Sequence, residues 1–240
     1  MATELFARGW VGVRVEGTNY GPVLAQCQKH HFAPLWILDR GQEASVPGGI
    51  ACEVGNECNA GCGPRWQKLS SADYTAWVLE AWPVLRAKGN VCYVGAANNT
   101  SPSGIQWTKE VLAKLPMHPD LRVSFHRYPD GDQNVTKPKK GYASLAAEDA
   151  AILDCVRGRR WAISEAGLVD CTTTSGFWFW KKTVMRTAVA GHRTQAARFR
   201  RLGADFYVYY QMQDEGGQTS GYGVRGNDGL WKATANLPTL

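Results

Sequence analysis

Short apolar runs of strand type alternate along the chain with longer stretches whose apolar residues recur at helical spacing. The apolar runs predict seven strands, at residues 10–15, 33–39, 49–57, 91–96, 121–128, 160–165 and 205–211. The periodic stretches predict helices at residues 20–31, 71–88, 104–115, 144–156 and 183–202, after an opening segment at 3–9 that reads as the end of another helix. Because parallel strands need crossover helices, this alternation predicts parallel βα units.

The stretch after Ser70 carries the clearest helical pattern. Ser70 or Ser71 is expected to cap the helix, and Gly89 is expected to end it. Its apolar stripe is formed by Tyr74, Trp77, Val78, Ala81, Trp82 and Leu85. By contrast, residues 40–49 are too few for a full crossover helix, so we expect an abbreviated unit there.

No internal repeat, low-complexity segment or linker divides the sequence, so one domain over residues 1–240 is expected. Seven strands are one short of a closed eight-stranded barrel. The sequence therefore predicts a (β/α)8 TIM-barrel-like fold in which the first strand is missing or altered. An open barrel exposes strand edges, and a second copy of the chain, another assembly partner or an N-terminal segment is expected to cover them.

The composition is that of a globular protein, with 44% hydrophobic and 20% charged residues in 240. Ten Trp and nine Tyr supply aromatic faces of the kind that line sugar-binding clefts, although most Trp residues are core residues. The net charge of +6 is a weak bias toward anionic partners, but no nucleic-acid-binding motif accompanies it, so no nucleic acid is expected.

The opening residues Met1 to Leu5 lack the basic and apolar regions of a signal peptide, and no run of eighteen apolar residues occurs. We therefore expect a soluble protein without membrane attachment. Synthesis is expected in the cytoplasm, with any action outside the cell by a non-classical route or as part of an assembly.

Seven cysteines at irregular spacing do not form a disulfide framework, and no paired C-x-x-C motif indicates zinc. Cys52, Cys92 and Cys155 lie in apolar runs, where Cys behaves as a small buried hydrophobic residue. A local disulfide or metal site at Cys58 and Cys62 is the alternative to free thiols there. No metal and no cofactor are expected for the chemistry of this chain.

Two carboxylates stand at the ends of short apolar runs that break into Gly-containing loops. Glu57 ends the run from Gly49, and Glu165 ends the run from Arg160. Catalytic groups of α/β barrels come from the C-terminal ends of several strands. Two such Glu residues across a barrel mouth suit glycoside hydrolysis, in which one carboxyl group is the general acid and the other attacks carbon or activates water.

Several motifs, in the correct order, resemble those of the clan A glycoside hydrolases, which are (β/α)8 retaining glycosidases. Asn56-Glu57 is similar to the Asn-Glu pair of strand four, and 163–167 is similar to the nucleophile strand seven. His126-Arg127-Tyr128 resembles the His-x-Tyr of strand six, and Arg14 resembles the strand-two Arg. The departures are Cys58 in place of Pro after Glu57, and Gln211 or Met212 where a sugar-stacking Trp is common.

The resemblance implies a retaining glycosidase that cleaves β-glycosidic bonds of an oligo- or polysaccharide by double displacement. Glu57 would be the acid/base and Glu165 the nucleophile. The supporting and substrate-binding residues would be Arg14, Asn56, His126, Tyr128, Gln211 and Trp178. The two carboxyl groups are then expected about 5 to 5.5 Å apart.

Structural roles remain open for each of these residues, including a Glu165 that is simply ion-paired to Arg14. Glu53 is assigned a structural role, on the opposite side of its strand from Glu57. The candidate sugar platforms are Trp36, Trp66, Trp107, Trp178 and Trp180. The competing function is a non-catalytic carbohydrate-binding or structural barrel in a larger assembly.

Overall fold

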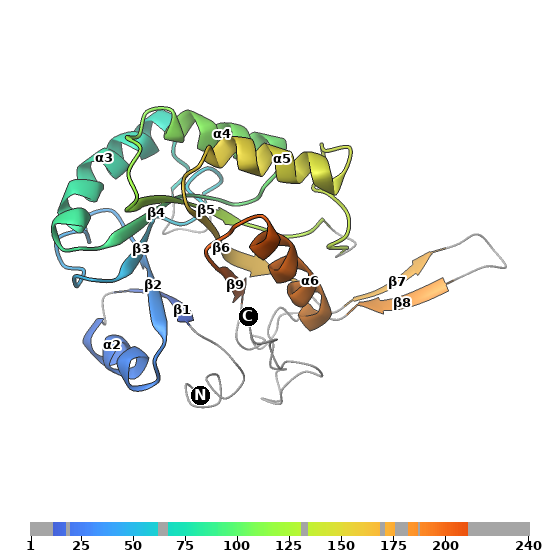
Figure 1. Cartoon of the computed structure of the whole chain (residues 1–240), viewed down its shortest axis with the longest axis horizontal. Coiled ribbons are helices and arrows are strands. Elements are labelled where there is room, and N and C mark those ends of the chain that lie inside the picture. Colours follow the sequence, from blue (N-terminus) through green and yellow to red (C-terminus); the bar gives the residue numbers. More distant parts are fainter. Residues whose placement is uncertain are drawn as a thin grey trace.

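The computed structural model describes residues 12–17, 20–61, 67–130, 134–168, 171–175, 182–186 and 188–210, and every structural statement below concerns these residues. Seven parallel strands form one sheet in the order β1-β2-β3-β4-β5-β6-β9. Their bounds are β1 Gly12–Glu16, β2 Ala33–Leu38, β3 Ala51–Val54, β4 Val91–Ala97, β5 Leu121–His126, β6 Trp161–Gly167 and β9 Tyr207–Tyr210. The sheet curls into a nearly closed barrel with helices on its outside (Figure 1).

The predicted TIM-barrel-like fold is therefore confirmed. Each strand pairs with the next strand of the sheet along the chain, which is the arrangement that repeated βα units produce. Within the described ranges β1 and β9 are the two ends of the sheet. The segment expected to replace or alter a first strand lies outside these ranges.

Five helices are described, and they lie on the outer face of the sheet (Figure 1). They are α2 Tyr20–Lys29, α3 Ser71–Ala87, α4 Pro102–Leu112, α5 Leu145–Val156 and α6 Ala188–Arg201. Three of them begin at a serine whose side chain accepts a hydrogen bond from a first-turn backbone N–H, namely Ser70, Ser101 and Ser144. As predicted, no helix connects β2 to β3, and Gly89 follows the end of α3 with a φ of 74°.

The main core lies between the helices and the outer face of the barrel. In β3, Cys52 and Val54 are fully buried in this layer together with Tyr74 and Trp77 of α3. A smaller cluster of Leu35, Tyr93 and Ala162 is separate from this layer and joins β2, β4 and β6. Because side chains alternate along a strand, Glu53 between Cys52 and Val54 points to the inner face.

The prediction of a helix over 183–202 is wrong for its first turn. Residues Lys182–Arg186 form strand β8, which pairs antiparallel with β7 (Cys171–Ser175), and α6 begins only at Ala188. The three consecutive threonines at 172–174 and the Thr183-Val184 pair are β-branched, and such residues favour strands. The hairpin extends away from the barrel (Figure 1).

In the described part of the chain no helix has both the length and the apolar character needed to cross a membrane.

Candidate active site

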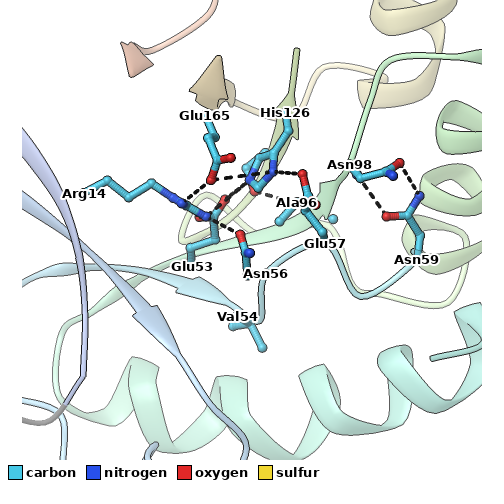
Figure 2. Close-up of polar contacts among 12 residues, drawn as sticks. Arg14, Glu53, Val54, Asn56, Glu57, Asn59, Ala96, Asn98, His126 and Glu165 are labelled. Carbon is cyan, nitrogen blue, oxygen red and sulfur yellow. Dashed lines mark hydrogen bonds and ion pairs between the residues drawn. The ribbon is translucent and has the colours of Figure 1, made fainter. Parts of the chain in front are cut away.

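Strands β1, β5 and β6 and the residues that follow β3 and β5 bring six of the predicted site residues together. Figure 2 labels five of them. These six residues are Arg14, Asn56, Glu57, His126, Tyr128 and Glu165. The other two, Gln211 and Trp178, lie outside the described residues. The close contacts described below join residues up to 151 positions apart in the sequence.

Arg14 of β1 is the cation at the centre of the group. Its Nη1 donates to Oε2 of Glu165 at 2.5 Å, and its Nη2 donates to Oδ1 of Asn56 at 2.6 Å. Its Nε donates to Oε2 of Glu53 at 2.7 Å. Burial alone would lower the pKa of Arg14, but the charges of Glu53 and Glu165 outweigh that effect and raise the pKa above its usual value. Arg14 therefore stays charged.

Glu165 is held on both of its oxygens. Arg14 binds Oε2, and the Tyr128 hydroxyl donates a hydrogen bond to Oε1. The Tyr128 ring lies directly against Gly167, where an added Cβ would meet Cε1 of Tyr128 at 2.1 Å. A carboxylate that accepts two such bonds is fixed in orientation.

Glu57 lies three residues beyond the end of β3, in a turn, and not on the strand as the sequence suggested. Its φ is 48°, a left-handed conformation that is uncommon for residues other than glycine. The Glu57 backbone N–H donates to the carbonyl oxygen of Ala96 at the end of β4, at 3.1 Å. This contact ties the turn to the neighbouring strand and so helps to hold the carboxyl group at the barrel mouth.

His126 connects the two ends of the site. Its Nε2 lies 3.3 Å from Arg14 Nη2, which can only donate, and its Nδ1 lies 2.9 Å from Oε1 of Glu57. In a neutral imidazole, Nε2 therefore accepts from Arg14 and Nδ1–H donates to Glu57. His126 is completely buried, so this hydrogen-bonded position is well defined.

The two candidate catalytic carboxyl groups face each other. One oxygen of Glu57, one of Glu165 and a ring nitrogen of His126 all lie within 4.8 Å of one another. Glu57 and Glu165 keep 12% and 9% side-chain exposure, so both are reachable from the mouth. This spacing leaves room for one reacting carbon and its leaving oxygen between the two groups.

Three potential metal ligands in one place also raise the question of a cation. Oε2 of Glu165 is already bound by the charged guanidinium of Arg14 at 2.5 Å, and Nδ1 of His126 faces Glu57. Arg14 thus supplies positive charge to Glu165 and Glu53, whereas the carboxyl group of Glu57 is paired with His126.

Glu53 was assigned a structural role on the opposite side of β3, and the structure places it inside the site. Its side chain is fully buried, with Oε2 on Arg14 and Oε1 3.9 Å from Nε2 of His126. The signal for this position is the alternation within β3 itself, where buried apolar residues flank Glu53 on both sides.

The structure also decides between the alternatives for two candidate sugar platforms and for Cys58. Trp36 is fully buried and packs on Tyr20, and Trp107 of α4 packs on Tyr74 of α3 in the outer core layer, so neither serves as a sugar platform. Cys58 is a free, buried thiol, which excludes the local disulfide considered for it. Burial raises the pKa of the Cys58 thiol to about 12, so this thiol is also a poor metal ligand.

No protein-family model and no curated protein sequence matches this chain. Its fold, however, is similar to that of solved glycoside hydrolases. A broad-specificity GH5-4 endoglucanase from Clostridium acetobutylicum is 14% identical, with a TM-score of 0.59 over 96% of this chain and 85% of that chain. A family 17 β-1,3-glucanosyltransferase from Rhizomucor miehei is 14% identical, with a TM-score of 0.58 over 94% and 85%.

A family 51 α-L-arabinofuranosidase from Bifidobacterium longum is 16% identical, with a TM-score of 0.50 over 70% of this chain and 49% of that chain. At these identities the likeness concerns the fold. The chain has the (β/α)-barrel fold of these glycoside hydrolases, and its site must be judged from its own residues.

Proposed function

We propose that this chain is a retaining glycoside hydrolase that cleaves β-glycosidic bonds of an oligo- or polysaccharide. The observation that carries the proposal is the arrangement around Glu165. Arg14 and Tyr128 hold its two oxygens, and a carboxyl oxygen of Glu57 lies within 4.8 Å. Retaining glycosidases place their two carboxyl groups about 5 to 5.5 Å apart, whereas inverting enzymes leave a wider gap for water.

In the first step, a Glu165 oxygen attacks the anomeric carbon while Glu57 gives its proton to the glycosidic oxygen. The bond between carbon and leaving oxygen breaks, and a glycosyl ester of Glu165 forms. In the second step, Glu57 takes a proton from water, and the water oxygen attacks the same carbon. The ester bond breaks, which restores the Glu165 carboxylate and the protonated Glu57.

The supporting residues have defined parts in this scheme. Arg14 and Tyr128 stabilise the charge that Glu165 carries before attack and regains after it. His126 orients the Glu57 carboxyl group through Nδ1–H. The Oδ1 of Asn56 is taken by Arg14, which leaves the Asn56 amide nitrogen as a donor for a sugar hydroxyl.

Support for β-linked substrates comes from the fold neighbours, which include an endoglucanase and a β-1,3-glucanosyltransferase. The arabinofuranosidase shows that the same fold also carries α-specific chemistry. A panel of β-1,4-glucan, β-1,3-glucan and β-1,4-mannan is therefore the first choice of substrates, with an α-arabinofuranoside as the comparison.

Glu57→Gln and Glu165→Gln test the proposal on this panel. Each is expected to lower kcat by about 10²- to 10⁴-fold or more, because each removes an acid/base or a nucleophile. The matched control is Glu80→Gln, since Glu80 is an exposed residue of α3 paired with Arg40. It is expected to keep parental activity.

Azide distinguishes the two roles. With an activated aryl β-glycoside, Glu57→Ala is expected to give a β-glycosyl azide and Glu165→Ala an α-glycosyl azide. Binding of the glycans without turnover by the parent would favour a non-catalytic carbohydrate-binding barrel instead. Retained activity in both Gln variants would exclude this site as the catalytic centre.

A further inference from the structure

The loops after β3 and β4 are locked together beside Glu57. The backbone N–H of Asn98 donates to Oδ1 of Asn59 at 2.9 Å, and Nδ2 of Asn59 donates to Oδ1 of Asn98 at 3.2 Å. Figure 2 shows this pair on the side of Glu57 that faces away from Glu165. The pair therefore lies next to the acid/base and outside the group that holds the nucleophile.

The orientation of the Asn98 amide is fixed by its neighbours. Asn59 uses its oxygen to accept from a backbone N–H, so its nitrogen must be the atom that faces Asn98. Asn99 does the same, because its Oδ1 accepts from the backbone N–H of Ser101 at 2.9 Å while its Nδ2 donates to Asn98 at 2.9 Å. Oδ1 of Asn98 thus receives two hydrogen bonds.

The Nδ2 group of Asn98 takes no part in these hydrogen bonds. In the described part of the chain it has no hydrogen-bond partner, and it is not among the fully buried polar atoms. Asn98 is only half-buried. An oriented NH2 group with two open donor positions therefore faces accessible space beside Glu57.

The loop that presents this group is rigid. An added Cβ at Gly104 of α4 would lie 2.2 Å from the carbonyl oxygen of Asn99, so the loop sits directly on the helix. Thr100 is fully buried and donates to the buried carboxylate of Glu148 at 2.5 Å. A donor held in this way binds a ligand oxygen at a low entropic cost.

We propose that the NH2 group of Asn98 binds an oxygen of the sugar unit on the leaving-group side of the cleaved bond, and that Asn59 and Asn99 position it. The inference rests on the proposed function, because the acid Glu57 defines which side the leaving group occupies. A neutral amide donor suits a hydroxyl or ring oxygen of a neutral sugar. Asn98 then contributes to selection for substrates with a sugar beyond the scissile bond.

The test compares two substrates that share the same sugar on the Glu165 side. Cellohexaose places a sugar on the leaving-group side, whereas 2,4-dinitrophenyl β-cellobioside does not, and its leaving group needs no proton. Asn98→Asp keeps the oxygen that Asn59 and Asn99 bind, and it replaces the NH2 group by a second, negatively charged oxygen. Asn98→Ala removes the whole amide, and Asn134→Asp is the control for the added charge, since Oδ1 of Asn134 accepts from Thr136.

For Asn98→Asp and Asn98→Ala, kcat/KM on cellohexaose is expected to fall about 3- to 10-fold, the value of one lost neutral hydrogen bond. On the aryl cellobioside it is expected to stay within about 2-fold. Equal losses on both substrates, or no loss on either, would overturn the inference. Laminarihexaose with the matching aryl laminaribioside replaces this pair where the parent prefers β-1,3-linkages.

If the parent protein hydrolyses neither substrate pair, the proposed function is contradicted. The role of Asn98 in sugar binding is then tested by binding measurements alone. Calorimetry with cellohexaose and laminarihexaose then decides it. Weaker binding by Asn98→Asp than by the parent and by Asn134→Asp supports the Asn98 site. Equal binding, or none by the parent, overturns it.

Discussion

At the scale of single residues, Glu53 is the most deeply buried charge in the site. Its side chain has no exposed area, and its only hydrogen bond in the described part of the chain comes from Arg14. A buried carboxylate of this kind is held in place by its partner and orients that partner in turn. Glu53 therefore fixes the angle at which Arg14 meets Glu165.

Replacing Glu53 by Gln tests this role. The amide has nearly the same shape but no charge, so Arg14 loses one of its two carboxylate partners. The free energy of unfolding is expected to fall by about 1 to 3 kcal/mol, measured in urea, and kcat/KM is expected to fall with it. Full activity and stability in Glu53→Gln would mean that Glu165 and Asn56 alone position Arg14.

The position of Glu53 could have been read from β3 by itself, where alternate residues are core residues of the outer layer. The sequence interpretation failed because it did not apply this alternation: Glu53 and Glu57 are four positions apart, so even a strand that continued to Glu57 would place both on one face. The strand ends at Val54, and Glu57 lies in a turn with a φ of 48°, where the period of two no longer holds. Arg14, Asn56, His126 and Tyr128 could be predicted because their motifs occur in the right order.

The buried thiols give a second prediction at this scale. Burial raises the pKa of Cys52, Cys58 and Cys155 to about 12, so almost no thiolate is present near neutral pH. These three thiols are expected to resist labelling by iodoacetamide at about pH 8 in the folded protein and to react after unfolding. Mass spectrometry of labelled peptides measures this, and rapid labelling of Cys58 in the folded state would contradict the structure around Glu57.

At the scale of elements, Gly167 of β6 packs against Tyr128, which lies two residues beyond the end of β5. An added Cβ at Gly167 would lie 2.1 Å from Cε1 and 2.6 Å from Cδ1 of Tyr128. Gly167→Ala is therefore expected to push the Tyr128 ring away from Glu165. Because small misplacements at a reacting group are costly, kcat/KM is expected to fall by about 10²-fold.

A double-mutant cycle with Tyr128→Phe checks that the effect passes through the tyrosine. If it does, Gly167→Ala adds little to the loss already caused by Tyr128→Phe. Gly21→Ala in α2 is the control, since an added Cβ there meets nothing within 4 Å. Additive losses would show that Gly167 acts on something other than Tyr128.

The hairpin β7–β8 was not predicted from the sequence, although most helices were. Helices α3, α4 and α5 have serine caps and apolar stripes, and they were predicted to within two residues at either end, apart from the C-terminus of α4. Basic residues occur in both β8 and α6, so composition does not separate these two elements. The sequence pattern therefore predicted β8 and α6 as one helix. In the structure, residues 182–186 instead pair with the Thr-rich strand β7.

At the scale of the whole molecule, the barrel could be predicted because each βα unit folds against its neighbour in sequence. The strand order follows the chain, so local alternation was sufficient to give the topology. What the sequence could not give is the convergence of distant residues on one cation. Arg14 at one end of the sheet contacts side chains from β3, β5 and β6, and only the closed curvature of the sheet brings these together.

Arg14 should therefore matter to the stability of the entire barrel as well as to its chemistry. Arg14→Leu leaves the buried carboxylates of Glu53 and Glu165 without their cation, and breaking such a buried pair costs about 3 to 5 kcal/mol. The measurement is the free energy of unfolding in urea at several pH values for the parent and Arg14→Leu. A matched control is Arg40→Leu, because Arg40 forms an exposed ion pair with Glu80.

The sign of the pH dependence follows from the same charges. In the parent, the charges of Glu53 and Glu165 raise the pKa of Arg14 above its usual value. A cation whose pKa is raised by folding contributes stability that is fully present below its unfolded-state pKa and is lost only as the pH rises through its folded-state pKa. The stability deficit of Arg14→Leu is therefore expected to be present in full at each pH between about 6 and 9, far below the usual pKa of arginine. A deficit no larger than that of Arg40→Leu would mean that the buried charge of Arg14 does not stabilise the barrel.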